Sequence, residues 1–396
     1  MFYIRGRNFK KLDLIRILVS ILLYIFSFAC IFLPAGTFGL KNISFFLIIV
    51  ITLFYNPKNF NITKNEFIFA FLMPTFFILL SFITNSSDVI GVISRGLTGY
   101  LLLISIAIRR FKINFMAIVL NTLKILSFII IFLVLLDYFN IVDLNNNFLT
   151  QWFTKTENAM IGKDSNQLAF RYLIFFKSSP LLLLLLLYSL NKNSYTWSIL
   201  SLISILLTGT RANFFVSIFV CFFYLIFIKK GKTLKFIILF LSIGFIILFL
   251  DDFIYVIEDI FLRKGDSDSV RTGHLESILL LLSNTKILIF GQGLSSYFFS
   301  TGIDKFTNIV ELSYWDLLRQ LGIVGFSFFT IFLIYLSILI SKKEGYLWLL
   351  ITLISYLIIA YTNPLLYSST GYILFIVVMT FTYKKERIFT LWKELF

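Results

Sequence analysis

The sequence has 396 residues, of which 59% are hydrophobic and 14% are charged, and its formal net charge is +15. Soluble domains carry about 25% charged residues, so this composition excludes a soluble globular protein and indicates an integral membrane protein. One histidine and two cysteines exclude a metal site with several imidazole ligands and a disulfide framework. Cytoplasmic loops rich in Lys and Arg account for much of the positive charge, so the charge does not indicate nucleic-acid binding.

Apolar segments follow one another along most of the chain. A membrane span needs about 20 apolar residues, and about twelve segments are candidates. The basic stretch 1–16 carries no cleavage signal, so we expect the first span to be an uncleaved helix. The predicted fold is an all-α polytopic membrane protein in which residues 1–396 form a single transmembrane domain. The candidate spans are 12–33, 39–55, 66–84, 89–108, 115–139, 166–189, 194–210, 212–229, 233–250, 320–341, 346–361 and 369–383.

The loop charges predict the orientation. Segments on the side of the N-terminus hold most of the Lys and Arg, including "RRFK" at 109–112 and "KKGKTLK" at 229–235, whereas 251–311 has more acidic than basic residues. The positive-inside rule therefore predicts cytoplasmic termini, with 140–165 and 251–311 external. Within the second of these loops, "SVRTGHLESILLLL" (269–282) predicts a short amphipathic helix that is too brief to span.

Placed on this topology, several polar residues collect at the outer face. We expect them to line one cavity that opens outward. An arginine within the bilayer costs about 2.5–3.5 kcal/mol, so we expect a phosphate or pyrophosphate ligand, which arginine binds through paired N–H donors, to offset that cost. The candidates are Arg95, Asn166, Arg171, Arg211, Arg271, His274, Glu311, Arg319 and Asn363.

Each of these residues also has an ordinary structural interpretation. Arg95 and Arg171, near the outer ends of their predicted spans, can extend toward lipid headgroups. Glu311 can be an acid that the helix dipole favours at a helix N-terminus. Helix-end or loop roles fit Arg211, Arg271 and His274. The functional interpretation therefore depends on the convergence of these charges.

Three features together are similar to a known family. The first is the outer turn "TGTR" (208–211), and the second is the late external loop with an arginine and the turn "FGQGLSS" (290–296). The third is the spacing of Gly322 and Gly325 after Glu311, which stands where O-antigen ligases carry a histidine. The chain resembles the O-antigen polymerase and ligase superfamily, most closely its Wzy-type polymerase branch, and the external turn "TNPLLYSSTG" (362–371) fits that branch.

The resemblance implies a GT-C-like membrane enzyme of the bacterial inner membrane. It implies an inverting, metal-independent glycosyl transfer at the periplasmic face that needs no cofactor and extends an O-antigen or another surface polysaccharide. Donor and acceptor would be polyprenyl-pyrophosphate-linked oligosaccharides, with membrane lipid and a chain-length regulator protein as partners.

The residues suggest how such a transfer would proceed. Arg211 and Arg271 would stabilise the leaving pyrophosphate where negative charge develops, and Glu311 would accept the proton of the acceptor hydroxyl. Arg95, Arg171, Asn166, His274, Arg319 and Asn363 would contact substrate.

Two alternatives remain open on sequence grounds. One is an O-antigen ligase-like glycosyltransferase, which the carboxylate at position 311 disfavours. The other is a lipid-linked oligosaccharide flippase or other transporter. Transporters of this size are often built from repeated halves with charges near the midplane. No matching halves are evident, but Lys124 and Lys177 lie deep enough in predicted spans to keep this alternative open.

Overall fold

The computed structural model describes residues 3–4, 7–8, 11–55, 62–84, 88–163, 171–228, 265–308 and 310–382. The predicted span 233–250, the segment 229–235 and Asn166 lie outside this range. The α-helices are α1 (Lys11–Phe32), α2 (Leu40–Phe54), α3 (Lys64–Glu66), α4 (Met73–Thr84), α5 (Val89–Gly99), α6 (Ile104–Phe111), α7 (Phe115–Tyr138), α8 (Phe148–Lys155), α9 (Leu182–Asn191), α10 (Tyr195–Leu206), α11 (Arg211–Phe223), α14 (Gly265–Leu282), α15 (Thr285–Phe290), α16 (Ser313–Ser341), α17 (Leu347–Ile359) and α18 (Ser369–Thr382).

Short turns of 3-10 or π-helix extend several of these helices, and three small hairpins complete the described chain. The helical turns are η1 (Thr37–Gly39), η3 (Phe67–Leu72), η4 (Tyr100–Leu103), η5 (Ser179–Leu181), η6 (Tyr224–Ile228) and η7 (Ala360–Thr362). The strands pair antiparallel as β1 (Tyr3–Ile4) with β2 (Arg7–Asn8), β3 (Ala159–Lys163) with β4 (Tyr172–Phe176), and β5 (Phe298–Ser300) with β6 (Lys305–Thr307).

The helices confirm an all-α membrane protein in its main features. Within the described residues, seven helices are long and apolar enough to cross a bilayer, and four shorter apolar helices accompany them. The total of about twelve spans stays a prediction. The predicted span 166–189 is wrong in its first half, because 172–176 form β4 and the helix begins only at Ser179. The stretch "YLIFF" is rich in aromatic and β-branched residues, which favour strands, and an unbroken apolar run has no periodicity that separates strand from helix.

The core of the helical body contains two helices that other helices surround. Residues 182–187 of α9 are all leucine with no exposed surface, and residues 372–379 of α18 are equally buried. Helix α9 packs against α7, α10 and α17, and α18 packs against α1, α6, α7 and α16. A helix that is apolar all round must be covered on every side, which explains why these two short segments lack the polar stripe of a surface helix.

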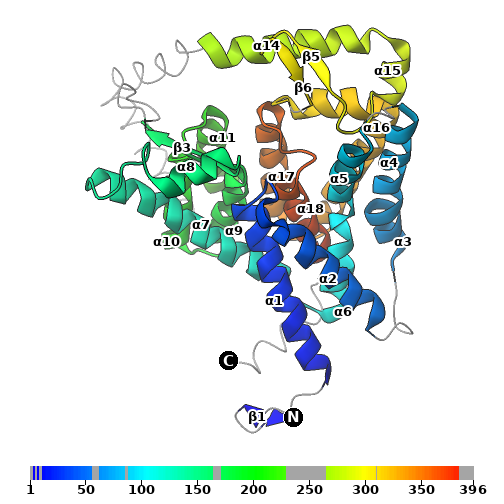
Figure 1. The fold of residues 1–396 in the computed structure, drawn as a ribbon. Coiled ribbons are helices and arrows are strands. Elements are labelled where there is room, and N and C mark those ends of the chain that lie inside the picture. Colours follow the sequence, from blue (N-terminus) through cyan, green and yellow to red (C-terminus); the bar gives the residue numbers. More distant parts are fainter. Residues whose placement is uncertain are drawn as a thin grey trace.

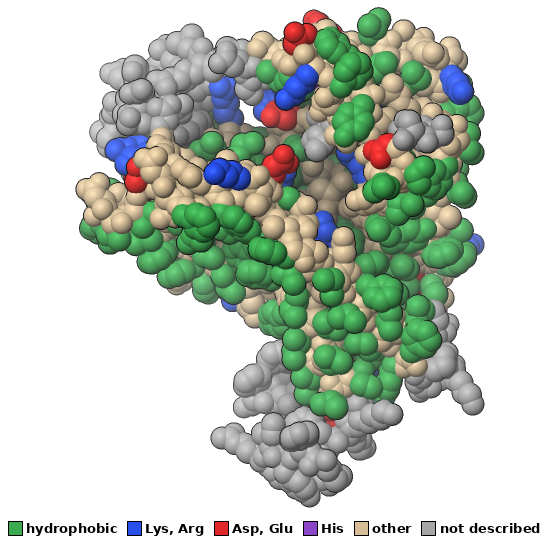
Figure 2. All heavy atoms as spheres, viewed as in Figure 1, with side chains coloured by type: hydrophobic (Ala, Val, Ile, Leu, Met, Phe, Trp, Pro, Cys, Tyr) green, Lys and Arg blue, Asp and Glu red, His purple; other side chains and the backbone are tan. Residues whose placement is uncertain are grey.

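The flank of the body is apolar and exposed. In α1, Leu14, Ile17 and Ile21 each expose more than two fifths of their surface. Figure 2 shows hydrophobic side chains covering the lower flank, whereas charged side chains gather toward the upper end. An exposed apolar belt of this kind suits the hydrocarbon core of a bilayer.

The two ends of the helical body are built from different segments. At one end, Arg16 at the start of α1 donates to the carbonyl of Lys112 at 2.9 Å. A cavity of about 340 Å³ at this end is lined by parts of 113–116, 188–192 and 344–348. At the other end, α14, α15, β5 and β6 form a layer across the helical body, which we call the outer layer (Figure 1). Among the described residues, Arg16, Lys112 and the segments that line this cavity thus lie together and apart from α14, while their side of the membrane stays a prediction.

The outer layer joins the body at a break in α16. Gly322 has φ 62° and ψ −177°, a conformation that favours glycine. The break leaves the carbonyls of Arg319 and Gln320 free to accept from the backbone N–H groups of Gln292 and Gly293, at 2.8 and 2.9 Å. The chain after α15 is thereby fixed against the first turns of α16.

We expect Gly322→Ala to lower the free energy of unfolding by about 3 kcal/mol or more, because backbone strain at such a position costs about 1–3 kcal/mol and the added Cβ would collide with the carbonyl of Ile289. Gly345→Ala is the matched control. Gly345 also has a positive φ, of 78°, but its Cβ would meet open space, so only the left-handed cost of about 1–2 kcal/mol applies. Thermal unfolding in detergent measures both, and equal melting temperatures for the two variants would contradict the proposed contact.

Candidate functional site

Four charged side chains from three separate segments form a chain of ion pairs at the outer end. Arg271 of α14 donates from Nε to Oε2 of Glu311 at 2.8 Å, and its Nη1 lies 3.4 Å from Oδ1 of Asp268. The other oxygen of Asp268 lies 4.0 Å from Nη1 of Arg211, at the start of α11. We call these four residues the outer cluster. Three of them are the residues that the sequence predicts to act in catalysis.

Local structure explains how each member reaches the cluster. Arg211 is the last residue of the "TGTR" turn. Gly209 in this turn has a φ of 67°, and an added Cβ would press on the backbone of β4, so the turn packs closely against that strand. Asp268 and Arg271 are three residues apart on α14 and therefore share a face. Glu311 lies just before Leu312, the residue that caps α16. The cluster thus joins α11, α14 and α16.

The outer cluster is partly open to solvent. The side chains of Arg271 and Glu311 are 30% and 45% exposed, and those of Arg211 and Asp268 lie between these values. Figure 2 shows a hollow near the upper end of the molecule with acidic and basic side chains around it. Half-exposed ion pairs contribute only about 0–1 kcal/mol each, so a ligand of stronger charge can displace them.

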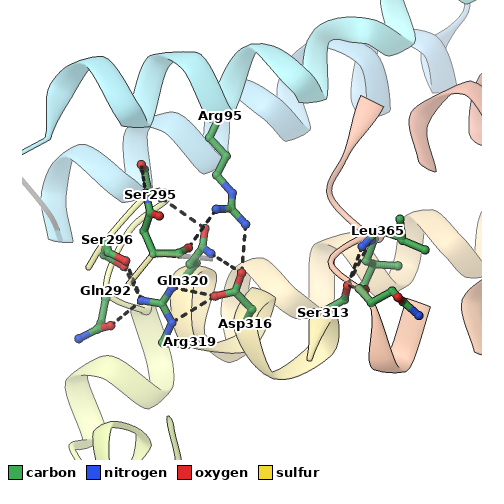
Figure 3. A network of polar contacts seen from close by, with 12 residues as sticks. Arg95, Gln292, Ser295, Ser296, Ser313, Asp316, Arg319, Gln320 and Leu365 are labelled. Carbon is green, nitrogen blue, oxygen red and sulfur yellow. Dashed lines mark hydrogen bonds and ion pairs between the residues drawn. The ribbon is translucent and has the colours of Figure 1, made fainter. Parts of the chain in front are cut away.

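A second group of charges lies beneath the surface, and we call it the buried network (Figure 3). Asp316 accepts from Arg319 at 2.7 Å through one oxygen and from Arg95 at 3.0 Å through the other. Gln320 also donates to it at 2.7 Å. Arg319 extends the network by donating from Nη1 to the side-chain oxygen of Gln292 and to Ser296.

The sequence predicts that Arg319 lines the outward cavity, but Arg319 lies in the interior of the protein. Its side chain is 0% exposed, each of its three nitrogens donates a hydrogen bond, and its guanidinium stacks on the ring of Phe298 at 4.4 Å. A guanidinium can be buried at this depth only when it is paired and its N–H groups are satisfied. Arg319 therefore holds the outer layer together. Arg95 is 24% exposed and remains at the edge of the network.

His274 is buried inside the outer layer, with 4% of its surface exposed. Its Nδ1 is 2.5 Å from the hydroxyl of Ser300 in β5. One residue earlier, Gly273 packs directly on the backbone of Gly302, where an added Cβ would have no room. These contacts hold α14 against the β5–β6 hairpin, and so they fix the position of Arg271, one turn away on α14.

The remaining predicted residues are dispersed. Arg171 is exposed and directly precedes β4, so it does not lie in a helix near the outer end of a span. The backbone carbonyl of Asn363 accepts from Ser313, and its amide donates to Ile359 at 3.1 Å. Asn363 thus fastens the turn before α18 to the start of α16. Asn166 lies outside the described residues.

Sequence reasoning missed the two acidic partners. Asp268 and Asp316 each precede an arginine by three residues, at Arg271 and Arg319, and both pairs form. The spacing i, i+3 on an expected helix is a usable signal for such pairs. Leu312, Trp315 and Leu318 all belong to one apolar cluster under α14.

The two lysines without an assigned role have local partners. Lys124 of α7 lies over the ring of Trp197 in α10, 5.0 Å from its centroid, which is a favourable cation–π geometry. Lys177 lies 3.6 Å from Glu157, which is largely exposed. Both charges are thus accounted for by contacts between neighbouring elements.

A comparison with protein-family models finds no match to the sequence, and neither does a comparison with curated proteins. We therefore infer the function of the protein from the geometry of the outer cluster and the chemistry of its residues.

The docking of α14 is expected to depend on pH through His274. Burial lowers the pKa of His274 below its ordinary value of 6.5, although Glu311 and Asp316 partly oppose this shift. The neutral ring is therefore favoured in the folded protein, and its contribution is complete above pH 6.5. That contribution is lost as the pH falls below 6.5 and through the lowered pKa.

Hydrogen exchange of the α14 amides, corrected for the intrinsic pH effect, measures this dependence. We expect faster exchange at pH 5 than at pH 7 in the wild type and a smaller difference in His274→Gln, which cannot titrate. An equal difference in the two proteins would show that another group is responsible.

Proposed function

We propose that the protein is a glycosyltransferase of the bacterial inner membrane that joins polyprenyl-pyrophosphate-linked oligosaccharides into a surface polysaccharide at the outer face. The observation that carries this proposal is the outer cluster. It combines two arginines with a carboxylate, drawn from segments far apart in the chain, at a partly open site on an apolar helical body. The resemblance to Wzy-type polymerases supports the same assignment.

The proposed reaction uses the two kinds of charge for two tasks. The hydroxyl of the acceptor sugar attacks the anomeric carbon of the donor and displaces the polyprenyl pyrophosphate with inversion. The bond between that carbon and the pyrophosphate oxygen breaks, and the leaving group gains negative charge. Arg211 and Arg271 would stabilise this charge, and Glu311 would take the proton of the attacking hydroxyl.

The ligand-free geometry suggests an order of events. Glu311 is paired with Arg271 at 2.8 Å, so the guanidinium occupies one of its oxygens in the ligand-free protein. An arriving pyrophosphate would compete for Arg271, because paired phosphate oxygens match the guanidinium fork. Transfer of Arg271 from Glu311 to the pyrophosphate would release the carboxylate, so Glu311 would become an effective base only when donor is bound.

Two observations favour a transferase over a transporter. A transporter for an anionic lipid-linked glycan would need cations along its path near the midplane, and the contacts of Lys124 with Trp197 and of Lys177 with Glu157 give both lysines structural roles. A transporter also has no need for a carboxylate placed against one of its anion-binding arginines. Such a carboxylate is required for proton removal.

We expect Glu311→Gln to reduce polymer synthesis by about 10²–10⁴-fold, the usual contribution of a general base, while lipid-linked single repeat units accumulate at an unchanged protein level. Electrophoresis of the surface polysaccharide and of the lipid-linked precursors measures both. Glu276→Gln is the matched control, because Glu276 is an exposed glutamate of the same outer layer.

A normal polymer ladder from Glu311→Gln would contradict the role of Glu311 as base. If Arg211→Ala and Arg271→Ala nonetheless abolished the polymer, the cluster would bind the lipid-linked glycan without catalysing transfer, as in a flippase. Lysine at these positions should restore activity only in part, since it lacks the guanidinium fork.

Asp268 should oppose the binding of an anion at the cluster. It lies between Arg211 and Arg271, so the free site has two positive and two negative side chains. We expect Asp268→Asn to tighten the binding of inorganic pyrophosphate by about fivefold, equivalent to about 1 kcal/mol at a half-exposed site. Calorimetric titration of the protein in nanodiscs measures this change. Asp304→Asn is the control, as it removes an exposed charge elsewhere in the outer layer, and weaker binding by Asp268→Asn would show that Asp268 instead positions the arginines.

A further inference from the structure

A polar cavity of about 360 Å³ lies on the far side of the buried network from Asp316. It is bounded by the end of α4, the first residue before α5, α15 and the loop that follows α15. Its functional lining consists of Thr84, Asp88, Lys286, Gln292, Ser296 and Tyr297. A volume of this size is at the lower end of the range for small-molecule sites.

The amide of Gln292 presents donors to this cavity. Its oxygen accepts from Nη1 of Arg319 at 2.9 Å, and because a guanidinium has no acceptor, the group that faces Arg319 must be the oxygen. The amide nitrogen then points away from Arg319, as Figure 3 shows. Arg319 is fully buried and held by Asp316, so the direction of these two N–H donors is fixed.

Asp88 supplies acceptors that are equally well placed. One oxygen caps α5 by accepting from the N–H of Gly91 at 2.9 Å, and the other accepts from the hydroxyl of Ser295 at 3.2 Å. Each carboxylate oxygen has a further lone pair. The carboxylate is therefore held in one orientation by contacts behind it and can still accept hydrogen bonds from a ligand.

Tyr297 and Lys286 complete the cavity from the rim. Tyr297 exposes 58% of its surface, which leaves its ring available for contact with an apolar face of a ligand. Lys286 is exposed and adds a flexible donor. Fixed donors, a fixed carboxylate acceptor and an aromatic ring suit a molecule with many hydroxyl groups and one apolar face, as a pyranose has. A phosphate fits less well, because the carboxylate of Asp88 would repel it.

Exposed apolar side chains flank the residues that line the cavity, as expected for a site beside lipid. Ile83, Ile90 and Phe290, each within two residues of a lining residue, expose 80%, 83% and 44% of their surfaces. Residues this apolar and this exposed suit the boundary between the bilayer and water. A sugar close to its membrane anchor would lie at this level.

The geometry points to this cavity as a binding site for a pyranose unit of a lipid-linked glycan, separate from the outer cluster. The identity of that glycan rests on the proposed function, whereas recognition of a sugar ring by Asp88, Gln292 and Tyr297 does not. Because Gln292 and Ser296 also hold Arg319, the site shares its wall with the buried network that positions α16 and, just before it, Glu311.

Saturation-transfer NMR tests the site on the full-length protein in nanodiscs of zwitterionic lipid. The probes are the methyl glycosides of glucose, galactose and N-acetylglucosamine. We expect saturation transfer to at least one of them, and we expect Tyr297→Ala and Asp88→Asn each to lower its affinity by about fivefold to tenfold. Asparagine retains a helix-capping oxygen, so Asp88→Asn should stay folded. Tyr138→Ala is the control, because Tyr138 is 70% exposed at the end of α7 and does not line the cavity.

The outcomes separate this inference from the proposed function. No transfer to any glycoside, or equal affinity in wild type and Tyr297→Ala, would overturn the sugar site. Competition by glycerol phosphate with greater strength than by the glycosides would overturn it in favour of a lipid headgroup. If the glycoside binds as expected while Glu311→Gln leaves the cellular polymer unchanged, the sugar site stands and the proposed polymerisation falls.

Discussion

The carboxylate of Asp316 is the contact on which the outer layer depends. It neutralises Arg319, which has no exposed surface, and it also pairs with Arg95 of α5. Removing one partner of a buried ion pair costs about 3–5 kcal/mol, because the other charge stays behind in a medium of low polarity. The side chain of Asp316 therefore couples the positions of α5, the first turns of α16 and the loop around Ser296. This coupling also makes the outer cluster above them more rigid.

The break in α16 also couples the outer layer to this helix. A continuous helix would use the carbonyls of Arg319 and Gln320 within its own ladder. The conformation of Gly322 instead leaves them to the backbone N–H groups of Gln292 and Gly293. The loop after α15 is thus bound to α16 by its backbone and, through Gln292 and Ser296, by its side chains. Neither set of bonds would orient that loop as firmly alone.

The sequence predicts the parts of this structure that depend on composition and local pattern. Apolar length marks the helices, and the "TGTR" turn and Glu311 mark two positions of the outer cluster. It does not predict β4, whose apolar run carries no periodicity, nor the burial of Arg319, whose partners Gln292 and Ser296 come from another element. An arginine near a helix end has the same local sequence whether it faces a cavity or a carboxylate. Only the tertiary fold distinguishes these environments.

An ion pair between a carboxylate and an arginine behaves differently when it is buried and when it is partly exposed. At Asp316 and Arg319 the charges are buried and fully bonded, so any rearrangement must leave a charge without a partner. At Glu311 and Arg271 both side chains are partly exposed, and water can replace either partner at a cost of about 0–1 kcal/mol. The second pair can therefore exchange partners when an anion arrives, while the first keeps α16 in place. The exchangeable ion pair Glu311–Arg271 thus lies next to the rigid ion pair Asp316–Arg319. A ligand can therefore change the contacts of the Glu311 carboxylate without moving α16, the helix that follows it.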